Sequence, residues 1–324
     1  MLLLCAGVCL LGACSRKVTP HTVGGFYFDT YVSLTLYDDG SAAEAAAKDF
    51  LSECARYDAL FSVTAEGSDI QRINQADGAA VSVSEDTICV LQIALDICTK
   101  SHGAANPAIG AVSSLWDFQH PEDAALPDAS ALREALQHTD PAGIRIDGTE
   151  VTFSDPAMRL DLGFIAKGYI ADRLKERLLA DGITSGILNL GGNVVVLGNK
   201  PDNTSYTVGI EKPFAQGEAL YTIAVSDTSV VTSGVYERCF TIDDHLYHHI
   251  LDPKTGYSVK NDLYSVTIVC ADSVTADALS TACFVLGLQD GMELIESTPD
   301  AEALFLDRSL QTHSSSGFPA IQRR

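Results

Sequence analysis

Apolar and polar residues alternate along this chain in patterns that predict short strands and helices. Residues 31–37 place an apolar residue at every second position, which is typical of a half-buried strand. Residues 41–61 carry an apolar stripe at helical spacing, opened by Ser41 as a cap. The pattern predicts two further helices in the first half, over 84–100 with Ser84 as its cap and over 129–138.

From residue 144 onward the pattern changes to short strands that turns separate. A long helix over 164–180 interrupts them, and a strand over 264–270 leads into a helix over 274–286. Because the strands come in runs with helices grouped around them, we expect an α+β fold with mixed or antiparallel sheets flanked by helices. The other predicted strands are 144–146, 151–153, 186–190, 194–197, 206–210, 220–225 and 230–232.

Length and charge narrow the class of protein. The chain has 324 residues, of which 46% are hydrophobic, so it can build a substantial core. Its formal net charge is −22, and no cluster of Lys and Arg is present that could bind a phosphate backbone. We therefore expect no nucleic-acid partner and interpret the excess charge as an acidic, solvated surface.

The N-terminus has the pattern of an export signal. Residues 1–14 are apolar, too short to span a bilayer, and end in Leu11-Gly12-Ala13-Cys14, which resembles the lipobox of bacterial lipoproteins. This resemblance implies that Cys14 is lipidated and holds the protein at the cell membrane, on its extracytoplasmic face. The alternative is an ordinary cleaved signal with an incidental cysteine.

The remaining chain divides by composition into three parts. Residues 15–25 contain Pro20 and a pair of glycines and are expected to form a tether, 26–310 one catalytic unit, and 311–324 a C-terminal tail. Six cysteines of the catalytic unit lie mostly in apolar segments without Cys-x-x-Cys spacing. We interpret them as buried apolar side chains, although an exported protein could pair some of them in a disulfide.

The segment from Arg159 to Asn193 carries the strongest chemical signal. An acidic residue, Asp161, ends an apolar strand; a glycine follows, and Lys167 lies in the first turn of a helix. This arrangement places backbone N–H groups and one cation beside an anionic ligand, so it predicts a phosphate site. The spacing differs from both the Walker P-loop and the dinucleotide fingerprint.

A second signal lies at the start of the helix predicted over 274–286. Asp277 and Thr281 are four residues apart and share a helix face. One carboxylate and one hydroxyl can serve a hard divalent ion when water, a carbonyl and a substrate phosphate complete its shell. Alternatively, Asp277 only complements the dipole of the helix.

Two loops add candidate residues. His249 precedes an Asp-Pro-x-Thr-Gly turn, where it could donate to a phosphate or exchange a proton, although a single histidine is more often simply packed. The loop 102–110 precedes Trp116, which could lie against a planar ring or anchor the core.

Taken together, these segments resemble the ApbE family of FAD:protein FMN transferases. They occur in the family's order over roughly residues 28–307. The matching segments are 61–74, the Asn106–Gly110 loop with Trp116, 161–169, 189–193, 209–213, 232–234, 249–256 and 276–282. The resemblance implies an ApbE-like (T-fold-like) catalytic unit that uses Mg²⁺ to cleave FAD at its pyrophosphate. FMN then passes to a Ser or Thr hydroxyl of an acceptor redox protein or membrane subunit, and AMP leaves.

The resemblance also implies roles for individual residues. Asp277 and Thr281 would be metal ligands, with the Phe164 carbonyl and Ser280 alongside, and His249 would lie next to the phosphates. The residues implied to hold FAD or to line its pocket are Asp161, Lys167, Phe28, Thr64, Ala105, Asn106, Pro107 and Leu251.

Two positions depart from the family pattern. Phe28-Asp29-Thr30 stands where the family has Met-Gly-Thr, and Thr64 stands where many members have an aromatic ring. Both affect flavin stacking, and with it the balance between transfer to protein and hydrolysis. Two alternatives therefore stay open: an Mg²⁺-dependent FAD pyrophosphatase that gives FMN and AMP, and a non-catalytic flavin-binding lipoprotein.

Overall fold

The computed structural model describes residues 19–38 and 40–324. Segment 1–14 with Cys14, and the first part of the predicted tether, lie outside these residues. The described helices are α1 (Ser41–Phe61), α2 (Asp69–Gln75), α3 (Glu85–Lys100), α4 (Gly110–Ser113), α5 (Ala129–Ala135), α6 (Ala166–Ala180) and α7 (Ser273–Glu296), with 3-10 turns η1 (Leu136–His138) and η2 (Pro141–Gly143).

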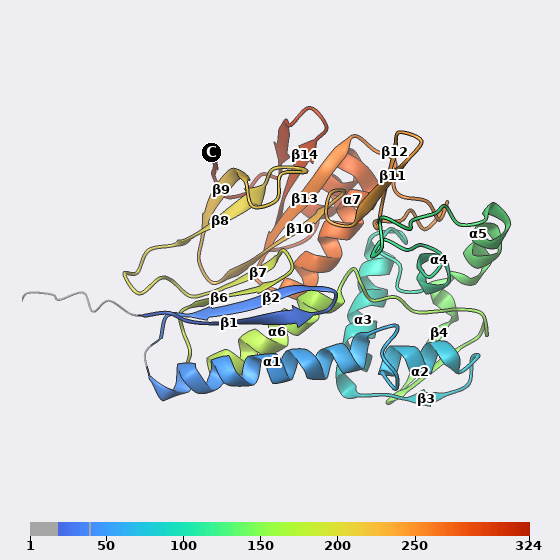
Figure 1. Cartoon of the computed structure of the whole chain (residues 1–324), viewed down its shortest axis with the longest axis horizontal. Helices are drawn as coiled ribbons and strands as arrows, with labels where there is room; N and C mark the ends of the chain where they lie inside the picture. Colours follow the sequence, from blue (N-terminus) through green and yellow to red (C-terminus); the bar gives the residue numbers. More distant parts are fainter. Residues whose placement is uncertain (1–18, 39) are drawn as a thin grey trace, which may run out of the picture.

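Within the described residues the main sheet has eight strands in the order β1-β2-β6-β7-β10-β13-β14-β15 (Figure 1). Every neighbouring pair in it is antiparallel. Its strands are β1 (His21–Tyr27), β2 (Thr30–Leu36), β6 (Gly186–Leu190), β7 (Asn193–Leu197), β10 (Thr228–Gly234), β13 (Leu263–Cys270), β14 (Ala301–Asp307) and β15 (Thr312–Ser314).

The remaining strands form small sheets. One consists of β16 (Ile321–Arg323), β9 (Ala219–Val225) and β8 (Tyr206–Glu211), in that order. A second consists of β3 (Val81–Ser82), β5 (Glu150–Phe153) and β4 (Ile144–Asp147). The third is the hairpin of β11 (Cys239–Ile242) and β12 (His245–His248).

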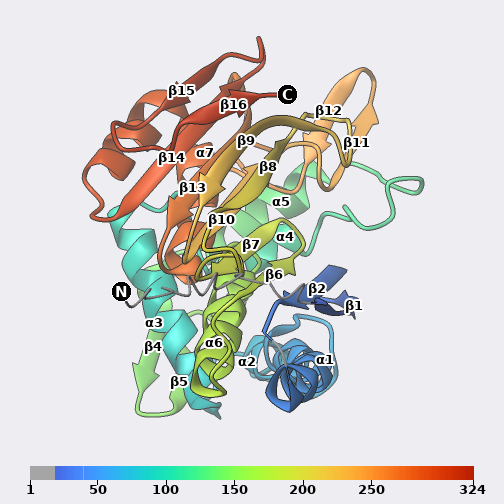
Figure 2. The same cartoon turned by 90° about the vertical axis from the view of Figure 1, so that its left-hand side faces the viewer.

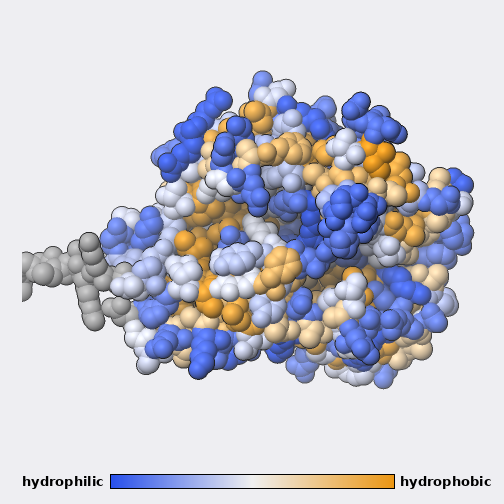
Figure 3. All heavy atoms as spheres, in the orientation of Figure 1, coloured by the Kyte–Doolittle hydropathy of each residue, from blue (hydrophilic) through white to orange (hydrophobic). Residues whose placement is uncertain are grey.

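The two faces of the main sheet are covered differently. Helices α1, α6 and α7 pack on one face and share the largest apolar cluster with it, and α3 joins this cluster by packing against α7. On the other face, Val196, Val230 and Leu304 pack against the small sheet β16-β9-β8, which lies in front of β10 and β13 in Figure 2. Exposed apolar residues are spread in small groups among hydrophilic ones on the face in Figure 3.

The predicted α+β fold with antiparallel sheets flanked by helices is confirmed. The alternating segments form β2 and the strands after residue 144, and Ser84 caps α3 by accepting the Thr87 N–H. The cap of α1 was predicted one residue late, since Gly40 occupies that position and Ser41 begins the helix.

Both ends of the described chain are more ordered than predicted. Residues 21–25, expected in the tether, belong to β1, and the tail 311–324 contributes β15 and β16. β16 was missed because its pairing partner, β9, lies far away in the chain. β1 pairs with the adjacent β2 and was missed because Pro20 and the two glycines indicated a tether. β15 and β16 have only three residues each, too few for an alternating pattern to be recognised.

Helix α7 runs through the middle of the molecule. It is long and apolar enough to cross a membrane, but its Phe284 and Cys283 are fully buried and it packs on β10 and β13 as a core helix. It extends ten residues beyond the predicted end at 286, across Gly287, whose φ of 82° interrupts the helical backbone.

The described cysteines all carry free thiols. Four of them are buried, as interpreted from the sequence, whereas Cys89 is exposed. The buried thiols are those of Cys54, Cys98, Cys270 and Cys283.

Candidate active site

The site begins with Asp277, in the second turn of α7. Only 4% of its surface is exposed, and its Oδ2 accepts the Gly168 N–H from the first turn of α6 at 2.8 Å. Burial raises the pKa of Asp277, while Lys167, the Gly168 N–H and the nearby Asn193 amide lower it. Asp277 is therefore a buried acid whose charged form depends on positive charge nearby.

Hydroxyl groups gather beside Asp277. Ser233, on β10, lies with its Oγ 2.6 Å from Ser280 Oγ and 3.2 Å from Thr281 Oγ1. Ser280 is fully buried and donates back to the Asp277 carbonyl at 2.8 Å. Thr281 is the more accessible of the two predicted hydroxyl ligands. Sequence reasoning matched Ser233 only as part of a motif and gave it no role.

The Phe164 carbonyl lies at the entry to α6. In a regular helix the Gly168 N–H would donate to the carbonyl four residues earlier, that of Phe164. Here that N–H donates to Asp277 instead. The donor set of Phe164, Asp277 and Thr281 thus consists of oxygens alone, and oxygens are the ligands that Mg²⁺ takes.

Among residues 19–38 and 40–324, no group of three or more His, Cys, Asp or Glu side chains could hold a metal ion. The predicted set contains a single carboxylate, so it requires a ligand that brings further oxygens. A bound pyrophosphate would supply these oxygens. Its negative charge would be balanced by Lys167.

His249 follows β12 and lies close enough to Lys167 for that cation to affect its pKa. Its backbone N–H donates to the Arg238 carbonyl at 3.1 Å, and its Nδ1 is buried without a hydrogen-bond partner in the described part of the chain. Burial, and then the positive charges of Arg238 and Lys167, lower the pKa of His249 to about 3. In this environment the imidazole is neutral at physiological pH.

Glu237 is a candidate that sequence reasoning missed. Its carboxylate lies over the turn between β6 and β7, where Oε1 would be 3.7 Å from a Cβ added at Gly192. Its side chain is accessible to solvent, yet the surrounding protein raises its pKa to about 7, against the opposing effects of Lys167 and Arg238. Its proximity to the predicted 232–234 motif was the available signal.

The residues predicted around the flavin fall into separate groups. Asp161 lies beside Pro107, whose carbonyl accepts its N–H at 3.0 Å. Its carboxylate accepts the Ser113 hydroxyl at 2.6 Å and the Gly163 N–H at 2.8 Å. Asp161 follows an isolated bridge between Arg159 and Ile109 rather than the predicted strand. It therefore holds two loops together.

The loop 105–107 is buried and rigidly held. Asn106 donates to the Thr139 carbonyl at 2.8 Å and accepts the Ala108 N–H at 2.9 Å, and Ala105 is 1% exposed. This loop and the Asp161 segment lie side by side, joined by the hydrogen bond from the Asp161 N–H to the Pro107 carbonyl.

Trp116 anchors the core. It is 7% exposed, and its indole N–H donates to the Gly256 carbonyl in the Asp-Pro-x-Thr-Gly turn at 3.0 Å. Its ring stacks on Phe118, with centroids 5.4 Å apart, and Leu251 belongs to the same apolar cluster. The core interpretation of Trp116 is confirmed, and its cluster supports the turn that follows His249.

Phe28 is half-buried against the largest apolar cluster, whereas Thr64 is exposed. Phe28 and Asp29 form the β1–β2 turn with φ of 54° and 56°, and the Phe28 N–H donates to Asp58 Oδ1 at 3.2 Å. Both central residues of this turn need positive φ, which explains why the family's glycine suits the second position. Thr64 is exposed after α1.

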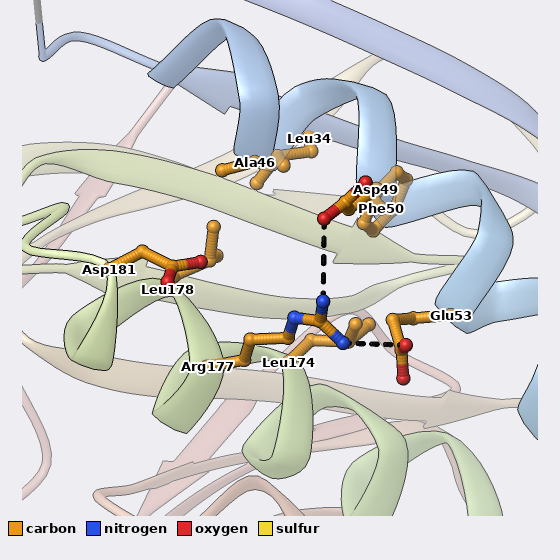
Figure 4. Close-up of a pocket in the computed structure, with 9 residues that line it drawn as sticks. All are labelled: Leu34, Ala46, Asp49, Phe50, Glu53, Leu174, Arg177, Leu178 and Asp181. Carbon is orange, nitrogen blue, oxygen red and sulfur yellow. Dashed lines mark hydrogen bonds and ion pairs between the residues drawn. The ribbon is translucent and has the colours of Figure 1, made fainter. Parts of the chain in front are cut away.

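A small cavity between α1 and α6 contains none of the predicted site residues. Arg177 bridges Asp49 and Glu53 across it, as Figure 4 shows. Arg177 lies ten residues after Lys167, roughly 15 Å along the helix axis. This cavity is therefore at the opposite end of α6 from the site.

Residues 28–305 match the ApbE family. The chain belongs to this family. It is 35% identical to an FAD:protein FMN transferase of Treponema pallidum, over 96% of this chain and 91% of that protein. It is 37% identical to one of Klebsiella pneumoniae, over 86% of each.

Solved structures show the same fold. The ApbE protein of Thermotoga maritima superposes with a TM-score of 0.85 at 30% identity, over 92% of this chain and 97% of that one. The flavinyl transferase ApbE of Pseudomonas stutzeri, in its apo form, gives a TM-score of 0.81 at 27% identity, over 93% and 96%.

Proposed function

We propose that this ApbE protein transfers FMN from FAD to a Ser or Thr hydroxyl of an acceptor flavoprotein and releases AMP. The observation that carries the proposal is the hydrogen bond from the Gly168 N–H of α6 to Asp277, which brings this carboxylate close to Lys167 at the start of α6. An oxygen-only donor set next to a cation suits a metal-bound pyrophosphate. The names of the curated relatives support the same reaction.

Asp277, Thr281 and Phe164 would hold Mg²⁺, which would neutralise charge on the pyrophosphate oxygens in the transition state. Lys167 would bind the pyrophosphate as a second positive charge, and the α6 N-terminus favours the same anion. The loop of Ala105, Asn106 and Pro107 would orient the rest of FAD. Positioning of this kind is the main contribution that a protein makes to phosphoryl transfer.

The acceptor hydroxyl oxygen would form a new bond to the phosphorus of the FMN half, and the pyrophosphate bond to AMP would break. The hydroxyl proton needs an acceptor, and His249 has a buried, unpartnered Nδ1 within the described residues. Burial, and then the neighbouring positive charges of Arg238 and Lys167, lower its pKa. A bound pyrophosphate would counter those charges and raise the pKa of His249, which makes it a better base.

The test is to incubate the protein with FAD, Mg²⁺ and an acceptor domain that carries an Asp-Gly-Ala-Thr-type segment. Flavin fluorescence bound covalently to the acceptor, with one AMP released per flavin, is the expected result. Free FMN and AMP without labelled acceptor would identify a pyrophosphatase. Binding of FAD without any product would identify a flavin-binding lipoprotein.

Asp277→Ala tests the metal site in the same assay. We expect a loss of about a thousandfold or more in rate, because the variant removes the carboxylate ligand. Asp272→Ala is the control, since Asp272 is an exposed carboxylate at the start of the same helix. Retention of more than about a tenth of the activity at saturating Mg²⁺, a loss below roughly 1.4 kcal/mol, would contradict the assignment.

We also propose that a lipid on Cys14 anchors the protein to the extracytoplasmic face of the cell membrane. The Leu11-Gly12-Ala13-Cys14 sequence supports this location. Cys14→Ser should give a soluble protein or an unprocessed precursor on fractionation. Unchanged recovery with the membrane would point to another anchor.

A further inference from the structure

Helices α6 and α7 are joined by hydrogen bonds near their N-termini. The Gly168 N–H of α6 donates to Asp277 of α7, and the Ser273 and Val274 N–H groups of α7 donate to the two carboxylate oxygens of Asp172 on α6, each at 2.8 Å. Asp172 follows Gly168 by four residues, and Asp277 follows Ser273 by four. The two contacts are therefore one turn apart on each helix, and the helices run antiparallel here.

Asp172 of α6 caps the N-terminus of α7, because no side chain next to the start of α7 does so. The residue before the helix, Asp272, makes no side-chain capping bond and is exposed. The first N–H groups of a helix have no partner within it, so they need an external acceptor when they are buried. Ser273 is fully buried, and Asp172 satisfies both its N–H and that of Val274.

Close packing makes this contact rigid. A Cβ added at Gly168 would lie 2.7 Å from the Val274 Cα and 2.7 Å from the Asp277 Cβ, so only glycine lets the helices approach this closely. Ser273 Oγ also donates to Asn193 Oδ1 at 2.7 Å, which links the start of α7 to β7. A shift of α7 along α6 would break all of these bonds together.

We propose that Asp172 is a positioning residue of the metal site, because it fixes the first turn of α7 and thereby the place of Asp277 opposite α6. The inference rests on the proposed role of Asp277 as a metal ligand. Both carboxylate oxygens of Asp172 accept hydrogen bonds from backbone N–H groups of α7. Asp172 therefore acts through α7 rather than by binding substrate. Groups that hydrogen-bond a metal ligand directly contribute about 10- to 100-fold to metal affinity. Asp172 acts on Asp277 through one further helical turn, so we expect an effect at the lower end of this range.

The experiment measures Mg²⁺ affinity by calorimetry and Mn²⁺ affinity by electron paramagnetic resonance, with FAD present. Asp172→Asn keeps the shape of the side chain but turns an –NH₂ group toward one of the α7 N–H groups. We expect its Kd for either ion to rise about tenfold or more. FAD binding without metal should stay within about twofold of wild type, and the lost transfer rate should return at saturating Mg²⁺.

The matched control is Asp272→Asn, which removes a carboxylate at the same helix end where no capping bond is made. Its metal affinity should equal that of wild type. A folded Asp172→Asn protein with unchanged metal affinity would overturn the inference. If Asp172→Asn does not fold, Asp172→Glu, which keeps the charge but lengthens the side chain, gives the same test with the same criterion.

Asp277→Ala is measured in parallel to separate this inference from the proposed function. Loss of metal binding in Asp277→Ala with wild-type binding in Asp172→Asn would leave the metal site standing and refute the role of Asp172. Wild-type binding in both variants would refute both.

Discussion

At the scale of single residues, Lys167 occupies a position that the dipole of its own helix disfavours for a positive charge. Lys167 lies in the first turn of α6, at the end of a helix whose dipole favours anions. It is close enough to Asp277, Glu237 and His249 to shift the pKa of each. A lysine held near Asp277 and Glu237 at a helix N-terminus is suited to bind a phosphate that enters the site.

Lys167→Ala should therefore weaken FAD binding by the loss of a charged hydrogen bond, about 1.5 to 3 kcal/mol, or roughly tenfold to more than a hundredfold in Kd. Riboflavin, which has no phosphate, should bind the variant almost as well as wild type. Fluorescence titration of both ligands measures this. Equal losses for the two ligands would mean that Lys167 maintains the shape of the pocket instead of binding phosphate.

His248 gives a pH-dependent contribution to stability. It is 2% exposed, its Nε2 lies 3.2 Å from the Val259 carbonyl, and burial lowers its pKa to about 4. Between about pH 6.5 and 4 the unfolded chain binds a proton at this residue and the folded chain does not. The free energy of unfolding therefore falls as pH is lowered through this window, by at most about 1.4 kcal/mol per pH unit.

We expect His248→Gln, which cannot titrate, to show a shallower fall of unfolding free energy between pH 6.5 and 4 than wild type. Urea denaturation at several pH values measures the two slopes. His249 is present in both proteins, so the difference between the two slopes reports the loss of the His248 imidazole. Parallel curves for wild type and variant would exclude His248 as the source.

At the scale of elements, the antiparallel contact of α6 and α7 assembles the site. Gly168 has no side chain, and its small size allows Asp277 to approach α6 closely. The site therefore depends on a packing distance between two helices as well as on its charged groups.

Gly168→Ala should destabilise the protein by about 1 to 3 kcal/mol, because the added methyl group overlaps the α7 backbone. Gly209→Ala is the control: Gly209 is exposed on β8, and the nearest contact of an added Cβ is the Ala219 methyl group at 3.2 Å. Urea unfolding measures both variants. Equal stability of Gly168→Ala and wild type would show that α7 can move away without cost.

At the scale of the whole molecule, the last residues complete both layers of sheet. β15 pairs with β14 at the edge of the main sheet, and β16 pairs with β9 in the small one. Phe318 and Ile321 pack against the apolar cluster between the two sheets. The C-terminal residues thus cover part of the apolar cluster between the two sheets that the rest of the chain does not cover.

A chain that ends at Leu310 should lose at least about 2 kcal/mol of unfolding free energy, since the burial of one large apolar side chain contributes about 1.5 to 3 kcal/mol. Urea denaturation measures this loss. Leu310→Ala in the full chain is the control, because Leu310 is already 37% exposed. Unchanged stability of the truncated chain would mean that β15 and β16 add no net stability.

The sequence by itself determined most of the elements and the identity of the charged residues. Period-two alternation located β2 and most of the strands after residue 144, and Ser84 marked the start of α3, since these signals arise between residues close in the chain. The spacing of Asp277 and Thr281 on one helix face is likewise a local property.

Only the tertiary structure decided what lies beside these residues. The Asp277–Gly168 bond joins residues 109 positions apart, and the Ser113–Asp161 bond joins residues 48 apart. Glu237 lies near the predicted 232–234 motif, but only the folded chain brings it close to Lys167 and Asp277. Likewise, β16 becomes a strand only because β9 offers it an edge. Pairings between distant segments depend on how the whole chain closes, and a local pattern contains no information about that closure.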